Sequence, residues 1–145
     1  MLSKLFTYLK YEQHLLGELL SISEKQQKAL IHFDTTMIQE LASYQEEVAR
    51  SLRETEEQRI KLLMTWLKLS RKEANELKLS SLERALFADE KIEMHNLRIE
   101  LKKLIDKVQN FNSMNRILAN RARTSVQELI KILTNGTNHV CNVRV

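Results

Sequence analysis

The stretch that decides the fold is residues 97–133, which read LRIELKKLIDKVQNFNSMNRILANRARTSVQELIKIL. Apolar side chains recur along it at alternating steps of four and three residues, the spacing that keeps one seam of an α-helix facing a partner helix. No Pro or Gly interrupts the stretch. It therefore predicts one long helix that packs along a single side. The seam consists of Leu97, Leu101, Leu104, Val108, Phe111, Asn115, Leu118, Ala122, Ser125, Leu129 and Ile132.

A second apolar stripe lies beside the seam near the end of this helix. It consists of Ala119, Val126, Ile130 and Leu133. One seam is sufficient to pack a helix into a bundle. The additional stripe therefore predicts a surface for a second partner.

Composition places the chain among all-α proteins. Its 145 residues include no Pro and only two Gly, a length typical of one domain and a composition that favours helix throughout. No apolar run is long enough to span a bilayer, so stable membrane insertion is not expected, and the N-terminus lacks the apolar region of a signal peptide. The lone Cys141 excludes an internal disulfide. We therefore expect a cytoplasmic protein.

Breaks in the pattern predict three long helices with short connections. Asp34 or Thr35 can cap the second helix, and Ser70 with Glu73 has the spacing of a capping box, as has Ser80 with Glu83. The apolar spacing slips at 88–94, where a kink or break is expected. Asn135 and Gly136 form a conventional helix end. The expected segments are helices at 2–33, 37–69 and 81–134, a helical turn at 71–78, and a joint at 79–80.

Short connections make successive helices antiparallel neighbours. The predicted fold is an elongated antiparallel three-helix bundle, with one domain at 1–134 and a flexible polar tail at 135–145. At 1.5 Å per residue the last helix is roughly 80 Å long, against roughly 50 Å for each of the others. Its last part is therefore expected to extend beyond the first two helices.

Three polar residues fall on the predicted seams. Glu12 and Arg59 come within about one helical turn of each other if the first two helices reverse at Asp34. They can form a pair that fixes the register of the helices, or each can reach water past an imperfect seam. Asn115 can likewise specify pairing within the bundle, or it can contact the backbone of a partner.

No group of residues supports catalysis. The four histidines and Cys141 stand at no common metal-binding spacing, and there is no Gly-rich phosphate loop or nucleophile with a base. We expect no enzyme activity, no metal and no cofactor. Residues 97–145 carry nine Lys and Arg against three Asp and Glu, a balance that can attract nucleic acid or anionic lipid. These basic residues are spread over several helix faces, so a solvated surface is favoured and a nucleic-acid partner is not expected.

Each predicted long helix also carries a group of residues that forms part of a familiar pattern. These are Leu5, Leu9, Glu12, Ala29 and Leu30, followed by Asp34; Glu56, Arg59, Leu62 and Leu63; and Asn112, Asn115 and Leu118. Together they resemble the FlgN family of flagellar export chaperones, over essentially the whole chain to about Leu133.

The resemblance implies a cytosolic chaperone of the flagellar type III export system. Such a chaperone holds hook–filament junction proteins before secretion, grips their C-terminal helical segments with its own C-terminal region, and passes them to the export apparatus. Family tails often carry a Tyr that docks to the export gate, whereas residues 134–145 contain none. The candidate partner-binding residues are Asn115, Leu118, Val126, Ile130 and Leu133.

Two other functions stay open at this point. A structural coiled-coil protein would use the second stripe for self-association, for example as a homodimer. A basic-helix nucleic-acid or lipid binder would instead use Arg116, Arg121, Arg123 and Lys131. Salt distinguishes the last class, because a phosphate-driven complex weakens steeply with ionic strength and an apolar contact does not.

Overall fold

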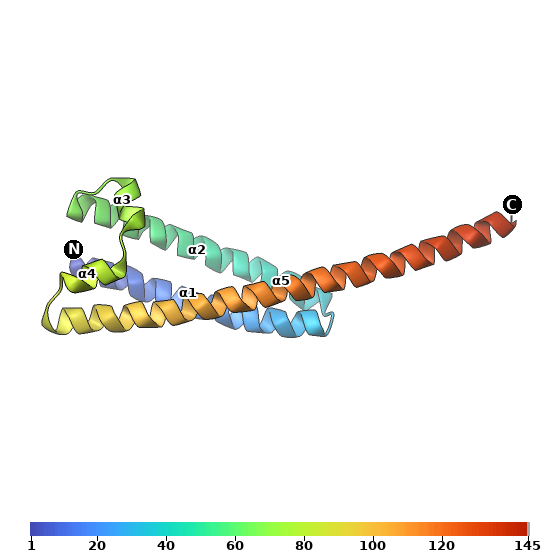
Figure 1. Cartoon of the computed structure of the whole chain (residues 1–145), viewed down its shortest axis with the longest axis horizontal. Helices are drawn as coiled ribbons and strands as arrows, with labels where there is room; N and C mark the ends of the chain where they lie inside the picture. The colour runs from blue at the N-terminus through green and yellow to red at the C-terminus, as the bar shows by residue number, and fades with distance from the viewer. Residues whose placement is uncertain (145) are drawn as a thin grey trace.

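The computed structural model describes the backbone of residues 1–144 and the side chains of residues 1–134. Helices joined by short connections make up this described part, which contains no strand, and this confirms the all-α prediction. Figure 1 shows the helices in chain order. They are α1 (Leu2–Ile31), α2 (Thr35–Leu67), α3 (Arg71–Glu76), α4 (Leu79–Arg84) and α5 (Ala88–Arg144).

Local capping groups set the ends of α2 and the start of α3. The Asp34 side chain accepts a hydrogen bond of 3.1 Å from the backbone N–H of Met37, which confirms Asp34 as the cap of α2. Lys68 ends α2 in the left-handed region, with φ of 54°. Ser70 accepts a hydrogen bond of 3.1 Å from the backbone N–H of Glu73, as predicted for the next helix start.

The region between α2 and α5 differs from the prediction. Two short helices occupy it, and the long helix begins at Ala88 rather than near residue 81. The predicted capping box of Ser80 and Glu83 does not form, because α4 begins after Lys78 without a side-chain cap. The break expected at 88–94 instead lies just before Ala88, so Met94 belongs to the regular helix. Tertiary contacts of Glu83, described below, replace the local cap.

The last helix also ends later than predicted. It continues to Arg144 instead of stopping at Thr134. Asn135 and Gly136 do not end it, since Gly costs only about 1 kcal/mol in a helix interior and no Pro follows to block the next turn. The expectation of a flexible polar tail at 135–145 concerns residues whose side chains lie outside the described part, and it stays a prediction.

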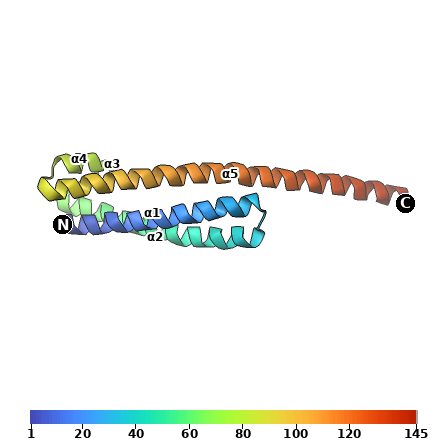
Figure 2. The same cartoon turned by 90° about the horizontal axis from the view of Figure 1, so that it is seen from below.

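The first helix, α1, lies at the centre of an open bundle. It packs against α2 on one side and α5 on the other, whereas the backbones of α2 and α5 do not approach each other closely in the described part of the chain. Figure 2 shows α1 between the two near the turn that joins α1 to α2. α2 runs antiparallel to α1, and α5 runs parallel to it (Figure 1). Buried apolar residues accordingly concentrate on α1, at Leu5, Phe6, Leu9, Leu15, Leu16, Leu19, Ile22 and Ala29.

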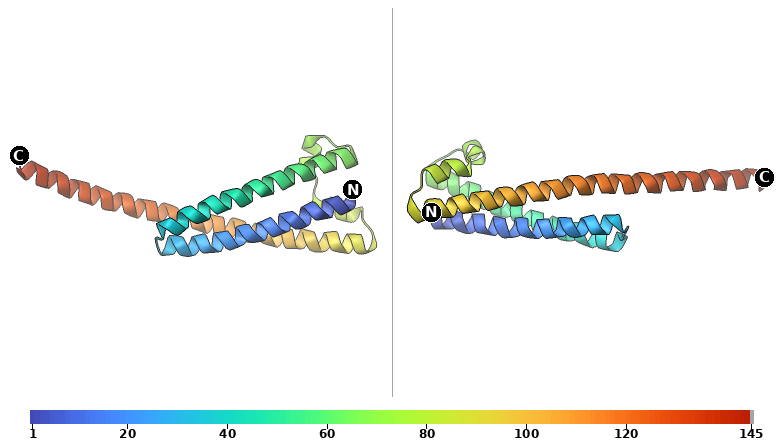
Figure 3. Two further views of the ribbon diagram at one scale, coloured as in Figure 1. Left: turned by 180° about the vertical axis from the view of Figure 1, so that it is seen from behind. Right: turned by 60° about the horizontal axis from the view of Figure 1, so that its bottom comes forward.

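Ion pairs attach the two short helices to the long ones. Arg71 of α3 donates two hydrogen bonds to Glu57 of α2, at 2.9 and 2.6 Å. Glu83 of α4 accepts a hydrogen bond of 2.6 Å from Arg98 of α5 and lies 2.7 Å from the ring of His95. The short helices thus occupy the end of the bundle where α2 and α5 diverge most (Figure 3).

The opposite end of the bundle confirms the expected excess length of the last helix. α5 continues well beyond the turn between α1 and α2, as Figures 1 and 3 show. Ala122 is its last half-buried residue, and every described side chain from 123 to 134 is exposed. We call the part of α5 beyond Ala122 the overhang.

Candidate partner-binding surface

The overhang presents a dense set of large apolar side chains to solvent. Their exposed fractions range from 47% at Val126 to 68% at Ile132. Scattered apolar residues are normal on a protein surface, but a contiguous set marks an interaction surface. The set, which we call the apolar arc, consists of Val126, Leu129, Ile130, Ile132 and Leu133.

The arc is wider than the sequence predicts, because the core seam of α5 ends early. Leu129 and Ile132 were expected in that seam, yet they are as exposed as Ile130. The physical reason is the length of the hairpin: α1 and α2 turn at residues 31–35, and no helix of the described part reaches the overhang. Buried positions on α5 are Met94, Leu97, Leu101, Val108 and Asn115.

The five predicted contact residues fall into three environments. Val126, Ile130 and Leu133 are exposed on the overhang. Leu118 is half-buried at its base. Asn115 is only 8% exposed and faces α1 inside the bundle.

A polar contact joins α5 to α1 where the bundle ends. The Asn115 amide nitrogen donates to the backbone carbonyl of Ser23 at 2.9 Å. The hydroxyl of Ser23, which is fully buried, donates to the side-chain oxygen of Asn112 at 3.1 Å. Directional bonds of this kind fix the register of two helices more sharply than apolar packing does. The buried side-chain oxygen of Asn115 itself has no hydrogen-bond partner within the described residues.

A groove lies beside this contact, between α2 and α5. It has a volume of about 440 Å³. Gln26 of α1 and Gln45 of α2 line it and are joined by a hydrogen bond of 3.0 Å. The groove exists because α2 and α5 pack on α1 without their backbones approaching each other closely. The residues that line it include Leu30, Ile38, Ala42, Asn115, Arg116 and Ala119.

Basic side chains flank the apolar arc. Arg116 and Arg123 are seven residues apart and so share one edge of α5, beside Ala119 and Ile130. Arg121 lies at the other edge, and Lys131 on the face opposite the arc. All four cations are exposed and form no ion pair within the part of the chain whose side chains are described.

Glu12 and Arg59 lie side by side between α1 and α2. The Arg59 Nε donates to both carboxylate oxygens of Glu12, at 3.0 and 3.1 Å. Glu12 is only 5% exposed. Burial raises the pKa of its carboxyl group above the usual 4.5, and the charge and hydrogen bond of Arg59 oppose that rise. The pair is far from the overhang, so it belongs to the framework of the bundle.

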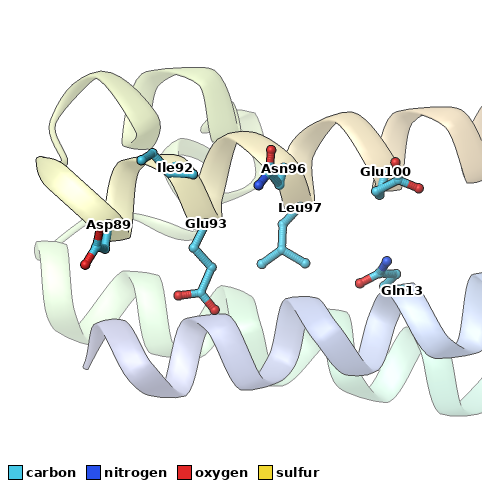
Figure 4. Close-up of a pocket in the computed structure, with 7 residues that line it drawn as sticks. All are labelled: Gln13, Asp89, Ile92, Glu93, Asn96, Leu97 and Glu100. Atoms are coloured by element: carbon cyan, nitrogen blue, oxygen red, sulfur yellow. The ribbon is translucent and has the colours of Figure 1, made fainter.

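A further depression, between α1 and α5, offers no catalytic arrangement. It has a volume of about 400 Å³ and lies near the start of α5, where Glu93 and Leu97 point toward α1 (Figure 4). Glu93 forms an ion pair of 2.7 Å with Lys10. Among the described residues, no group of three or more His, Cys, Asp or Glu side chains could hold a metal ion. The side chains of His139 and Cys141 lie outside those residues.

No helix in the described part of the chain combines the length and the apolar character that crossing a bilayer requires.

Sequence reasoning did not identify the groove or the role of Ser23. The bond of Ser23 to Asn112 joins residues far apart in sequence, so the local pattern gives no sign of it. Leu30, Ile38 and Ala42 follow ordinary helical spacing. No local signal distinguishes a groove residue from a core residue at such positions.

Comparison with known proteins identifies a family. The family model described as FlgN protein matches residues 1–143, essentially the whole chain. No curated protein and no solved structure matches the chain.

Proposed function

Because the chain belongs to the FlgN family, whose members are flagellar export chaperones, we propose that it binds hook–filament junction proteins in the cytoplasm and keeps them unassembled until secretion. The ligand in this proposal is the C-terminal helical segment of the client. The overhang is the surface that binds it. The protein acts by binding and not by catalysis.

One observation carries the proposal: a continuous helix holds an exposed apolar arc clear of the rest of the bundle. An amphipathic helix can lay its apolar face along such a surface. The arc is already ordered as part of α5, so most of the conformational entropy lost on binding is that of the client segment. This division suits a chaperone that receives an unstructured segment.

The exposed area supplies part of the binding free energy. Full burial of a large apolar side chain contributes about 1.5–3 kcal/mol. Because the arc residues are roughly half exposed, covering all five would contribute on the order of 4–8 kcal/mol before ordering costs. Micromolar binding needs a net of about 8 kcal/mol, so a client that binds this tightly must make further contacts beyond the arc.

The client is then delivered to the export apparatus, as the family relationship implies. We do not propose a Tyr-mediated contact with the export gate, since residues 134–145 contain no Tyr.

Self-association is the second candidate. The arc continues the heptad spacing of the core seam, which is also the pattern of a homodimeric coiled coil. Sedimentation of the protein without client over a range of concentrations distinguishes the two functions. A chaperone of the proposed kind stays monomeric at concentrations where it binds its client.

The decisive experiment replaces Ile130 and Leu133 together by Asp. Both side chains are more than half exposed, so the thermal midpoint should stay within a few degrees. Affinity for the C-terminal peptide of a hook–filament junction protein from the same bacterium should fall at least tenfold, which is about 1.4 kcal/mol. Calorimetric titration measures the affinity.

Two controls interpret the result. Asn120→Asp with Thr124→Asp adds the same charge to the polar face of the overhang and should leave binding nearly unchanged. Leu101→Asp places a charge in the core and should unfold the bundle. Unchanged affinity in the Ile130/Leu133 variant would refute the overhang as the client site.

A further inference from the structure

The groove and the apolar arc are parts of one continuous face of α5. Ala119 lines the groove. Seven residues further on, Val126 occupies the same face one heptad later, and Ile130 and Leu133 follow at steps of four and three. A helix packed along the arc toward the bundle therefore arrives at the groove mouth between α2 and α5.

The groove mouth has polar groups that the bundle itself does not use. Arg116 lines it and forms no ion pair within the described side chains. Next to it, the buried side-chain oxygen of Asn115 has no hydrogen-bond partner within the described residues. Buried polar atoms in proteins normally have partners, but this oxygen is covered by the bundle. The exposed guanidinium of Arg116 is therefore the group that an arriving segment with acceptor groups would contact.

Charge distinguishes between the candidate occupants. Residues 116–134 carry four basic side chains and one acidic side chain. Pairing two copies of this segment would bring like charges together along the edges of the arc, which disfavours a second copy. With an acidic partner helix, the same basic side chains make favourable contacts. Opposite charges beside a coiled-coil seam interact in this way.

We propose that the occupant is an acidic amphipathic helix of the client, which packs along the apolar arc with carboxylates facing Arg116 and Arg123 and inserts its end into the groove lined by Leu30, Ile38 and Ala42. This inference rests on the proposed function and adds a second contact region, on the α1–α2 hairpin, together with the charge of the ligand. Apolar contacts on the arc supply affinity, and the arginine edge sets the orientation of the client helix.

The charge arm of the test compares two double variants that change net charge equally. Arg116→Glu with Arg123→Glu reverses the edge next to the groove. Lys102→Glu with Lys131→Glu makes the same change on the exposed face of α5 opposite the arc. The probe is the C-terminal peptide of a hook–filament junction protein, with a second peptide whose Asp and Glu are replaced by Asn and Gln. We expect the first variant to bind the acidic peptide at least tenfold more weakly and the second to bind within about twofold of the native protein.

The groove arm fills the cavity without touching the overhang. Ala42 is an exposed groove residue on α2, and Ser43 is its exposed neighbour outside the groove. Ala42→Trp should weaken peptide binding at least fivefold, whereas Ser43→Trp should not. Circular dichroism melts confirm that all variants keep the fold.

The outcomes separate this inference from the proposed function. If the Ile130/Leu133 double Asp variant loses binding while the Arg116/Arg123 and Ala42 variants bind normally, the overhang is the client site and the acidic-helix inference is wrong. The same conclusion follows if the amide peptide binds as tightly as the acidic one. If the double Asp variant leaves peptide binding intact but dissociates a dimer, the occupant is a second copy, and both proposals are overturned.

Discussion

The pair of Glu12 and Arg59 allows a quantitative test of how the hairpin is held together. The perturbation is a double-mutant cycle that combines Glu12→Gln and Arg59→Gln. The two carboxylate oxygens lie 3.0 and 3.1 Å from Arg59 Nε, and the side chains are 7% and 21% exposed. Such geometry gives a charge-assisted contact with little screening by solvent.

The expected loss of stability in each single variant depends on which charged side chain remains without its partner. Loss of one partner from a fully buried pair costs about 3–5 kcal/mol. Arg59→Gln leaves the Glu12 carboxylate buried beside a neutral amide, and we expect a loss of about 2–3 kcal/mol. Glu12→Gln leaves a cation that can turn toward water, so about 1–2 kcal/mol is expected. The coupling energy should be about 1–2 kcal/mol.

The same pair predicts an unusual dependence on pH. The pKa of Glu12 is raised above 4.5 in the folded state, so the folded chain holds this proton more tightly than the unfolded chain does. The contribution of Glu12 to stability is therefore full below about pH 4.5 and falls as pH rises through the folded pKa. Arg59→Gln removes the groups that oppose the rise, so the cost of this substitution should be smaller at pH 5 than at pH 7.

Urea denaturation followed by circular dichroism at both pH values measures all four members of the cycle. Comparison with the native protein at each pH removes the contribution of other carboxylates. Additivity within about 0.5 kcal/mol would show that the two residues act independently. A cost of Arg59→Gln that grows toward pH 5 would refute the argument from burial.

Two further predictions concern the framework. Leu101→Ala, at a buried position, should lower the free energy of unfolding by about 2–4 kcal/mol, whereas Ile132→Ala, on the overhang, should change it by less than about 0.5 kcal/mol; a similar loss at both positions would mean that the overhang is covered. Glu83→Gln tests the attachment of α4. The hydrogen bond from Arg98, aided by His95, holds the pKa of Glu83 below its usual value. The contribution of the Glu83 carboxylate to stability is therefore present at neutral pH and is lost as pH falls through the folded pKa. Calorimetry should show a lower melting temperature for Glu83→Gln at pH 7 and a difference that shrinks in acid, and a constant difference would contradict this assignment.

Local chemistry made much of the architecture predictable. The cap at Ser70 depends on a side chain that bonds a backbone group within three residues, so the sequence alone places it. For α2 the sequence left Asp34 and Thr35 as alternatives, and the structure shows the bond at Asp34. The apolar periodicity of residues 97–133 likewise identifies the face of α5 that avoids water. The end of α5 was missed because helix termination at Asn135 and Gly136 is only a preference.

Sequence therefore determined the helical class, the cap at Ser70 and the apolar side of every long helix, since each depends on neighbours a few positions away. Only the tertiary structure decided which part of that side is covered. Leu101 and Leu129 occupy equivalent places in the same repeat, yet one is core and the other is exposed. The difference depends on where α1 and α2 end and on how far α5 is offset along them. The end points and the offset are set by many contacts between distant residues, such as that of Ser23 with Asn115. Periodicity describes a surface, and only the lengths and offsets of packed helices leave part of it open to a partner.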